Sequence, residues 1–181
     1  MYKIYDRLYI DIRESEEQTK DLIIKSKQKH ITSTDYHESH YSINRDYGPI
    51  NICNIVKFIN YIDKLYNEPK IYNKDIIYYV YLNENNSYLL NSVFLFGCYL
   101  VIKLNIQINY VINILLKIFN SHPCYYIDCI SKYGGYYSSI IDCLKSINFI
   151  YKNNIENINN FDIENYEYMT DYLYRDMNLI A

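Results

Sequence analysis

The chain has 181 residues, the size of one large domain, which can bury a core without disulfides or metals. Half of the residues are hydrophobic and 22% are charged, which excludes a disordered or collagen-like chain. The net charge of −3 provides no global positive field for nucleic acid, so we expect no nucleic-acid partner.

The negative charge gathers near the C-terminal end. Six acidic residues and one basic residue lie between Glu156 and Asp176, so this segment carries −5 and the rest of the chain +2. This segment is therefore the first candidate for a charged surface.

No apolar stretch precedes the first charged residues, Lys3, Asp6 and Arg7. We therefore expect no signal peptide and an intracellular protein of the nucleus or cytoplasm. The most apolar segment, 92–102, is shorter than the roughly 20 residues that span a bilayer, so it predicts a buried helix and no membrane partner. The five cysteines are an odd number, which we interpret as small buried hydrophobic residues.

The N-terminal third predicts two strands, an insertion and a helix. Residues 2–5 and 8–12 have the apolar pattern of short strands. Residues 13–39 are polar and rich in Lys, Gln, Ser and Thr, typical of a surface insertion, with a helix possible over 16–27. A helical period of apolar positions then predicts a helix from Asn51, its N-cap, to about residue 66.

The middle of the chain predicts one strand–loop–helix unit. Residues 75–82 are a continuous β-branched and aromatic run, typical of a strand buried in a parallel sheet. A polar loop follows, and a long apolar helix begins near Tyr88. Further helices are predicted over 106–119, 135–151 and 162–174, which gives an α/β sandwich. The loop consists of Asn83, Glu84, Asn85, Asn86 and Ser87.

This loop stands where α/β folds bind phosphate, because free N–H groups at a helix N-terminus point at an anion. It contains no Gly, Lys, Arg or Cys. Neither a nucleotide-binding loop nor a thiolate cradle is therefore encoded there.

A cysteine phosphatase needs a low-pKa thiolate and an Arg six residues later to bind the phosphoryl oxygens. No cysteine of this chain meets that spacing. The residues six positions after the cysteines are Ile59, Leu104, Ile130, Gly135 and Phe149. We therefore expect no cysteine-phosphatase reaction from this chain.

The order of several short motifs resembles the N-terminal half of the cell-division-cycle-fourteen dual-specificity phosphatases, the mitotic-exit phosphatases. The landmarks run in order from residue 5 to 176, and the match is poor over the insertion. They are Tyr5-Asp6-Arg7-Leu8-Tyr9, His40-Tyr41-Ser42-Ile43, Asp46-Tyr47-Gly48-Pro49-Ile50-Asn51, Asn91 with Phe94, Gly97, Tyr99, Val101, Ile102 and Leu104, Ile141-Asp142-Cys143-Leu144, and Phe161-Asp162-Ile163-Glu164 with Tyr166 and Glu167.

The resemblance implies two tandem phosphatase-like α/β domains of which only the second is catalytic. Residues 1–160 would be the silent first domain, a central mixed or parallel sheet flanked by helices with a degenerate phosphate loop at Asn83–Ser87. Residues 161–181 would be an acidic linker helix leading to a catalytic partner domain. The alternative is a stand-alone protein-interaction module with the same fold.

The resemblance also implies an acidic groove that selects phosphoproteins with a downstream basic residue. Glu164, Glu167 and Asp176 match acidic positions of that groove. Thr170 replaces an acid, and Asp171 stands where a base is expected. A stripe of acids on a helix is also typical of a merely solvated face.

Three other patterns have simpler interpretations. Histidines and cysteines at 37, 40, 122, 124 and 129 lack zinc-site spacing, so we expect no metal and no cofactor. Cys143 lies in an apolar helical frame and is predicted to be a core residue. Tyr78, Tyr79 and Tyr81 lack interleaved basic residues and are predicted to be core rather than a nucleic-acid platform.

Overall fold

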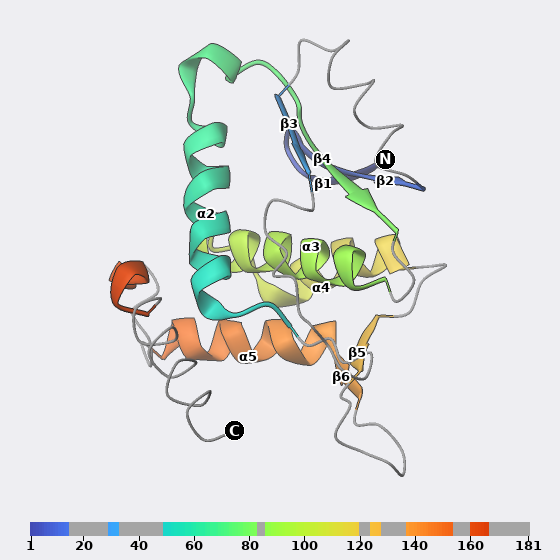
Figure 1. The fold of residues 1–181 in the computed structure, drawn as a ribbon, viewed down its shortest axis with the longest axis vertical. Helices are drawn as coiled ribbons and strands as arrows, with labels where there is room; N and C mark the ends of the chain where they lie inside the picture. Colours follow the sequence, from blue (N-terminus) through green and yellow to red (C-terminus); the bar gives the residue numbers. More distant parts are fainter. Residues whose placement is uncertain are drawn as a thin grey trace, which may run out of the picture.

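The computed structural model describes residues 1–14, 29–32, 49–82, 86–119, 124–127, 137–153 and 160–166. Figure 1 shows the elements of these residues as a sheet packed on a group of helices. In chain order they are β1 (Tyr2–Tyr5), β2 (Leu8–Arg13), β3 (Lys29–Thr32), α2 (Ile52–Tyr66), the 3-10 turn η2 (Pro69–Ile71), β4 (Ile76–Tyr81), α3 (Ser87–Cys98), the π-helical turn η3 (Tyr99–Lys103), α4 (Ile108–Leu116), the 3-10 turn η4 (Lys117–Phe119), β5 (Tyr125–Ile127), β6 (Tyr137–Ser139) and α5 (Ile140–Lys152).

The main sheet is mixed, with the strand order β1-β2-β4-β3. β1 pairs antiparallel with β2 through a two-residue turn, whereas β2 and β3 both pair parallel with β4. Residues 76–80 of β4 are buried, as the continuous apolar run predicts. The α/β class and the strands near residues 2–5, 8–12 and 75–82 are confirmed.

The polar stretch 13–39 contains one strand that its composition does not predict. Lys29–Thr32 forms β3 and continues the main sheet, with Lys29 opposite Ile76 and Thr32 opposite Tyr79. The pairing partner lies more than forty residues away in sequence, so local composition gives little indication of it. The possible helix over 16–27 falls outside the described residues.

Helix α2 confirms its predicted start and end. Asn51 has extended backbone angles and its Oδ1 accepts a hydrogen bond of 2.9 Å from the amide of Asn54, the geometry of an N-cap. The helix ends at Tyr66, and its apolar face packs into the core through buried residues such as Phe58 and Ile62.

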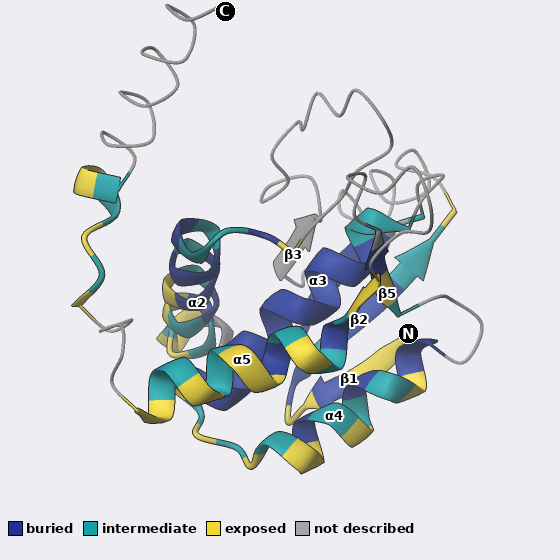
Figure 2. Ribbon diagram, turned by 90° about the horizontal axis from the view of Figure 1, so that it is seen from below, coloured by how far each residue is buried: buried dark blue, intermediate teal, exposed yellow. Residues whose placement is uncertain are grey.

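Helix α3 is the centre of the molecule. Every residue from Leu89 to Cys98 is buried, which requires neighbours on all sides. Figure 1 shows α3 between the main sheet and α5, and Figure 2 shows it buried along its length. On the sheet side, the rings of Phe58, Tyr78 and Phe96 meet edge to face with centroids 5.1 to 5.8 Å apart.

The prediction that segment 92–102 is a buried helix is confirmed, because it spans the end of α3 and most of η3. No helix among the described parts of the chain has the length and apolar character that a bilayer crossing requires.

The helix predicted over 135–151 begins later than expected. Residues Tyr137–Ser139 form β6, which pairs antiparallel with β5, and α5 starts at Ile140. Ser139 ends the strand and caps the helix, because its Oγ accepts from the amide of Asp142 at 3.1 Å. The side-chain cap therefore fixes the boundary that periodicity alone placed several residues too early.

The predicted C-terminal helix is described only at its start. Residues 163–166 are helical, and the Oδ1 of Asp162 accepts from the amide of Asn165 at 2.9 Å, so Asp162 caps this turn. The remainder of the predicted range lies outside the described residues.

Candidate functional site

The loop after β4 leads into α3 at the carboxyl edge of the parallel strands, where α/β folds place their binding loops. Asn83, Glu84 and Asn85 lie outside the described residues. Asn86 has a left-handed backbone with φ 57° and makes no side-chain cap, and Ser87 begins the helix. Asparagine tolerates this conformation better than most residues, so Asn86 supplies the bend that a glycine provides in other loops.

Three of the described cysteines, Cys53, Cys98 and Cys143, are poor candidates for a nucleophile at this loop. Cys98 ends α3, about 17 Å from its first turn at 1.5 Å per residue, and burial raises its thiol pKa, with a smaller contribution from Cys143. Burial also raises the pKa of Cys143, and Asp142 adds to that rise. Cys53 is buried as well, so Cys53 and Cys98 confirm the prediction of buried thiols, and Cys143, which is partly buried, packs against the core.

Of the two arginines that the structure describes, Arg13 lies nearer this edge, and it is already paired with Asp11. Asp11 on β2 is only 6% exposed, and its Oδ2 accepts from both Nε and Nη2 of Arg13, with 2.9 Å from Nε. The N-terminal amine of Met1 lies 3.3 Å from the other carboxylate oxygen. Arg13 therefore balances a buried carboxylate instead of presenting an open phosphate clamp.

Of the predicted groove residues, the structure describes one. Glu164 is exposed on the helical turn 163–166, close in sequence to Phe161 and Tyr166, whose rings pack with centroids 5.4 Å apart. Glu167 and Asp176 lie outside the described residues, so a shared acidic face stays a prediction.

The other patterns have mixed outcomes. Tyr78 and Tyr79 are buried at 0% and 4% exposure, which confirms them as core residues, and the side chain of Tyr81 is not among those described. His37, His40, His122 and Cys129 fall outside the described residues, so the expectation of no metal stays untested.

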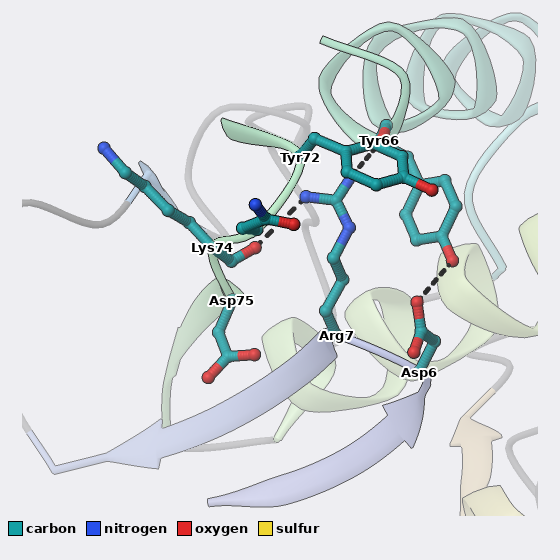
Figure 3. Close-up of a pocket in the computed structure, with 7 residues that line it drawn as sticks. Asp6, Arg7, Tyr66, Tyr72, Lys74 and Asp75 are labelled. Atoms are coloured by element: carbon teal, nitrogen blue, oxygen red, sulfur yellow. Dashed lines mark hydrogen bonds between the residues drawn. The ribbon is translucent and has the colours of Figure 1, made fainter. Parts of the chain in front are cut away.

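A cleft that sequence reasoning did not predict lies at the opposite, amino-terminal edge of the parallel strands. It has a volume of about 330 Å³ and is lined by three segments: the β1–β2 turn, the end of α2, and the stretch before β4. Figure 3 shows its side chains. The lining residues are Asp6, Arg7, Tyr66, Tyr72, Asn73, Lys74 and Asp75.

Arg7 joins these three segments. It is 9% exposed, and its Nη1 donates to the main-chain oxygen of Lys74 at 3.1 Å while its Nη2 donates to that of Tyr66. Its guanidinium carbon lies 4.6 Å from the ring centroid of Tyr66 and 5.5 Å from that of Tyr72. Because Tyr66 ends α2, Arg7 also places a positive charge at the negative end of the helix dipole.

Tyr66 stays a hydrogen-bond donor over most of the pH range. Its hydroxyl donates to Oδ2 of Asp6 at 2.8 Å. Burial, followed by this hydrogen bond and the charge of Asp6, raises the pKa of Tyr66 from 10.0 to about 12. The only sequence signal for this cleft was a charged pair, Asp6-Arg7, between two strands.

The fold and the loop define an α/β domain with the position of a phosphate loop, and Arg13 at the same edge of the sheet is paired with a buried carboxylate. A family model described as "Dual specificity protein phosphatase, N-terminal half" matches residues 3–149. The chain belongs to this family.

Curated relatives agree with this assignment. The chain is 25% identical over 182 aligned positions to "Dual specificity protein phosphatase CDC14C" of Homo sapiens, which covers 97% of this chain and 39% of the relative. It is 23% identical to the protein of the same name from Symphalangus syndactylus, covering 97% of this chain and 36% of the relative. The chain thus spans less than two fifths of the length of these relatives.

Proposed function

We propose that this chain is the catalytically silent N-terminal domain of a dual-specificity protein phosphatase, working in cis with a catalytic domain on phosphoprotein substrates in the nucleus or cytoplasm. Residues 1–160 form the domain and 161–181 a linker helix. The observation that carries this proposal is the alignment of 97% of the chain with less than two fifths of two named dual-specificity phosphatases. The description of the matching family model as the N-terminal half of such a phosphatase supports a role other than the whole reaction.

The cysteine thiols support the proposal that the chain is catalytically silent. A cysteine nucleophile reacts as a thiolate, and active sites lower its pKa to favour that form. Burial has the opposite effect on Cys98 and Cys143. The sequence also lacks an arginine six residues after any of its five cysteines.

We further propose that Glu164, Glu167 and Asp176 form one wall of an acidic groove for substrates with a basic residue downstream of the phosphoresidue. Glu164 supports this proposal because it is exposed at the start of the segment. The local charge of −5 over Glu156–Asp176 would attract a basic substrate residue at short range.

The alternative function is a stand-alone interaction module. The gene sequence after Ala181 distinguishes the two. A His-Cys pair followed by five residues and an Arg, within roughly one domain of about 150–200 residues, supports the phosphatase; a stop codon directly after Ala181 supports the module.

The groove is tested by reversing charge in the chain joined to its catalytic domain. Glu167→Lys combined with Asp176→Lys should lower kcat/KM for a phosphopeptide with a downstream Lys about tenfold, because each exposed pair contributes up to ~1 kcal/mol. Hydrolysis of a small aryl phosphate should not change. Asp171→Lys is the matched control for each of the two single substitutions, because it changes the charge of the same segment by the same two units at a position outside the proposed groove.

An equal loss on the peptide and on the aryl phosphate would count against the groove. So would an equal effect of Asp171→Lys on the peptide, because it would show that net charge alone matters.

A further inference from the structure

The cleft beside Arg7 lies at the start of β2 and β4, whereas the loop Asn83–Ser87 follows the end of β4. The two sites are therefore at opposite edges of the sheet, and a function of the cleft is separate from that of the loop. Three separate chain segments close around a volume of about 330 Å³, which is within the range of ligand-binding pockets.

The positive charge at the floor of the cleft is already matched. Arg7 is nine-tenths buried, donates to two main-chain oxygens, and lies at the C-terminal end of α2, which carries about half a negative charge. Figure 3 shows the side chain of Lys74 directed away from Arg7, so its ammonium group does not add to this floor. The floor therefore does not favour an anionic ligand.

The lining groups that remain open to solvent are carboxylates and an aromatic ring. Asp6 and Asp75 are both exposed and line the cleft on either side of the Arg7 side chain (Figure 3). Tyr72 contacts Arg7 with its ring but is 67% exposed. Carboxylates and aromatic faces both attract a cation, and a planar guanidinium can pair with the first while it stacks on the second.

We propose that this cleft binds an arginine side chain of a partner protein, with the guanidinium stacked on Tyr72 and paired with Asp75. The volume exceeds that of one side chain, so the peptide backbone next to the arginine also enters the cleft. Asn73, which lines the cleft and is exposed, is placed to hydrogen-bond that backbone.

The test uses the 181-residue chain and the peptide acetyl-Gly-Arg-Gly-amide, with binding followed by the NMR shifts of the Asn73 and Asp75 amides. We expect a saturable shift of these amides. Asp75→Asn and Tyr72→Leu should each weaken binding about threefold or more. Both residues are exposed, so these variants should keep the fold, which far-UV circular dichroism checks.

Lys74→Ala is the matched control and should bind at least as well as the unchanged chain. Acetyl-Gly-Gln-Gly-amide should not shift the amides. Saturation by spermidine with equal strength would identify a general polycation surface and overturn the proposal. Inorganic phosphate shifting the same amides, or no saturable shift with the arginine peptide, would overturn it as well.

Discussion

The hydroxyl of Tyr66, at the last residue of α2, donates a 2.8 Å hydrogen bond to Oδ2 of Asp6 in the β1–β2 turn. The main-chain oxygen of the same Tyr66 accepts from Arg7. Asp6 and Arg7, which are adjacent in the β1–β2 turn, are thus bonded to the side chain and to the main chain of Tyr66. These two bonds hold the end of α2 against the start of β2.

Replacing Tyr66 by Phe should make the unfolding free energy less sensitive to alkaline pH. Burial and Asp6 raise the pKa of Tyr66 from 10.0 to about 12, so the folded state favours the neutral phenol. Its contribution is complete below pH 10 and is lost as the pH rises through about 12. A shift of this size corresponds to about 2.7 kcal/mol, which we discount to about 1 kcal/mol because the residue is only partly buried.

Urea unfolding at pH 8 to 11.5 measures this effect. The unchanged chain should lose stability with a steeper slope than Tyr66→Phe. Equal slopes in the two proteins would contradict the assignment of the hydrogen bond.

Replacing Arg7 by Lys should lower the unfolding free energy by about 2 kcal/mol. A single ammonium group cannot reach the two carbonyl oxygens of Tyr66 and Lys74 with the fork geometry of a guanidinium, and a buried carbonyl left unpaired costs about 1–3 kcal/mol. Arg13→Lys is the matched control, because a lysine there can keep one ion pair with Asp11, and it should cost less than about 1 kcal/mol. Equal losses in urea unfolding would refute a specific role of Arg7.

Replacing Gly97 by Ala should destabilise the packing of α3 against its neighbours. A Cβ at this position would lie 2.5 Å from Cδ2 of Leu144 and 2.9 Å from Cδ1 of Leu115, and both leucines are buried. Overpacking costs about 1–3 kcal/mol, which exceeds the gain of about 1 kcal/mol that Ala brings to a helix. The net loss should be about 1 kcal/mol.

The double variant Gly97→Ala with Leu144→Ala tests the cause of this loss. Leu144→Ala alone leaves a cavity and should cost about 2–5 kcal/mol. The added methyl group then fills part of that cavity. The loss of unfolding free energy in the double variant should therefore be smaller than the sum of the two single losses. Strict additivity would show that the two side chains do not meet.

Cys98 should resist alkylation in the folded chain. Only the thiolate reacts with iodoacetamide, and burial raises the thiol pKa of Cys98 above its ordinary value. Mass spectrometry at pH 8 should detect its modification only after denaturant is added, whereas the partly exposed Cys124 should react first. Rapid labelling of Cys98 without denaturant would contradict the buried position and weaken the argument for silence.

Local signals predicted much of the fold. The N-cap at Asn51 and the apolar run over 75–82 each act within a few residues, so their elements were predicted with nearly correct ends. β3 escaped prediction because its hydrogen bonds are made with a distant strand. The sequence pattern predicts a helix over β6 because Ser139 is both the last residue of this strand and the N-cap of α5.

The cleft is formed by residues that lie even farther apart in the sequence than β3 and β4. Arg7 bonds to an oxygen 59 residues away and to another 67 residues away. The sequence shows an Asp-Arg pair between two strands but not its partners. The position of the loop at residues 83–87 follows from its neighbours β4 and α3, whereas its lack of phosphatase chemistry stays a prediction from the residue types alone.

The most direct test of a silent N-terminal domain is phosphatase activity measured with the catalytic half alone, the 181-residue chain alone, and the two joined. We predict that the chain alone does not hydrolyse an aryl phosphate above background, and that joining it to the catalytic half raises kcat/KM for a phosphopeptide with a downstream Lys while activity on the aryl phosphate stays the same. Hydrolysis by the chain alone that is lost when its five cysteines are replaced by serine would contradict the account.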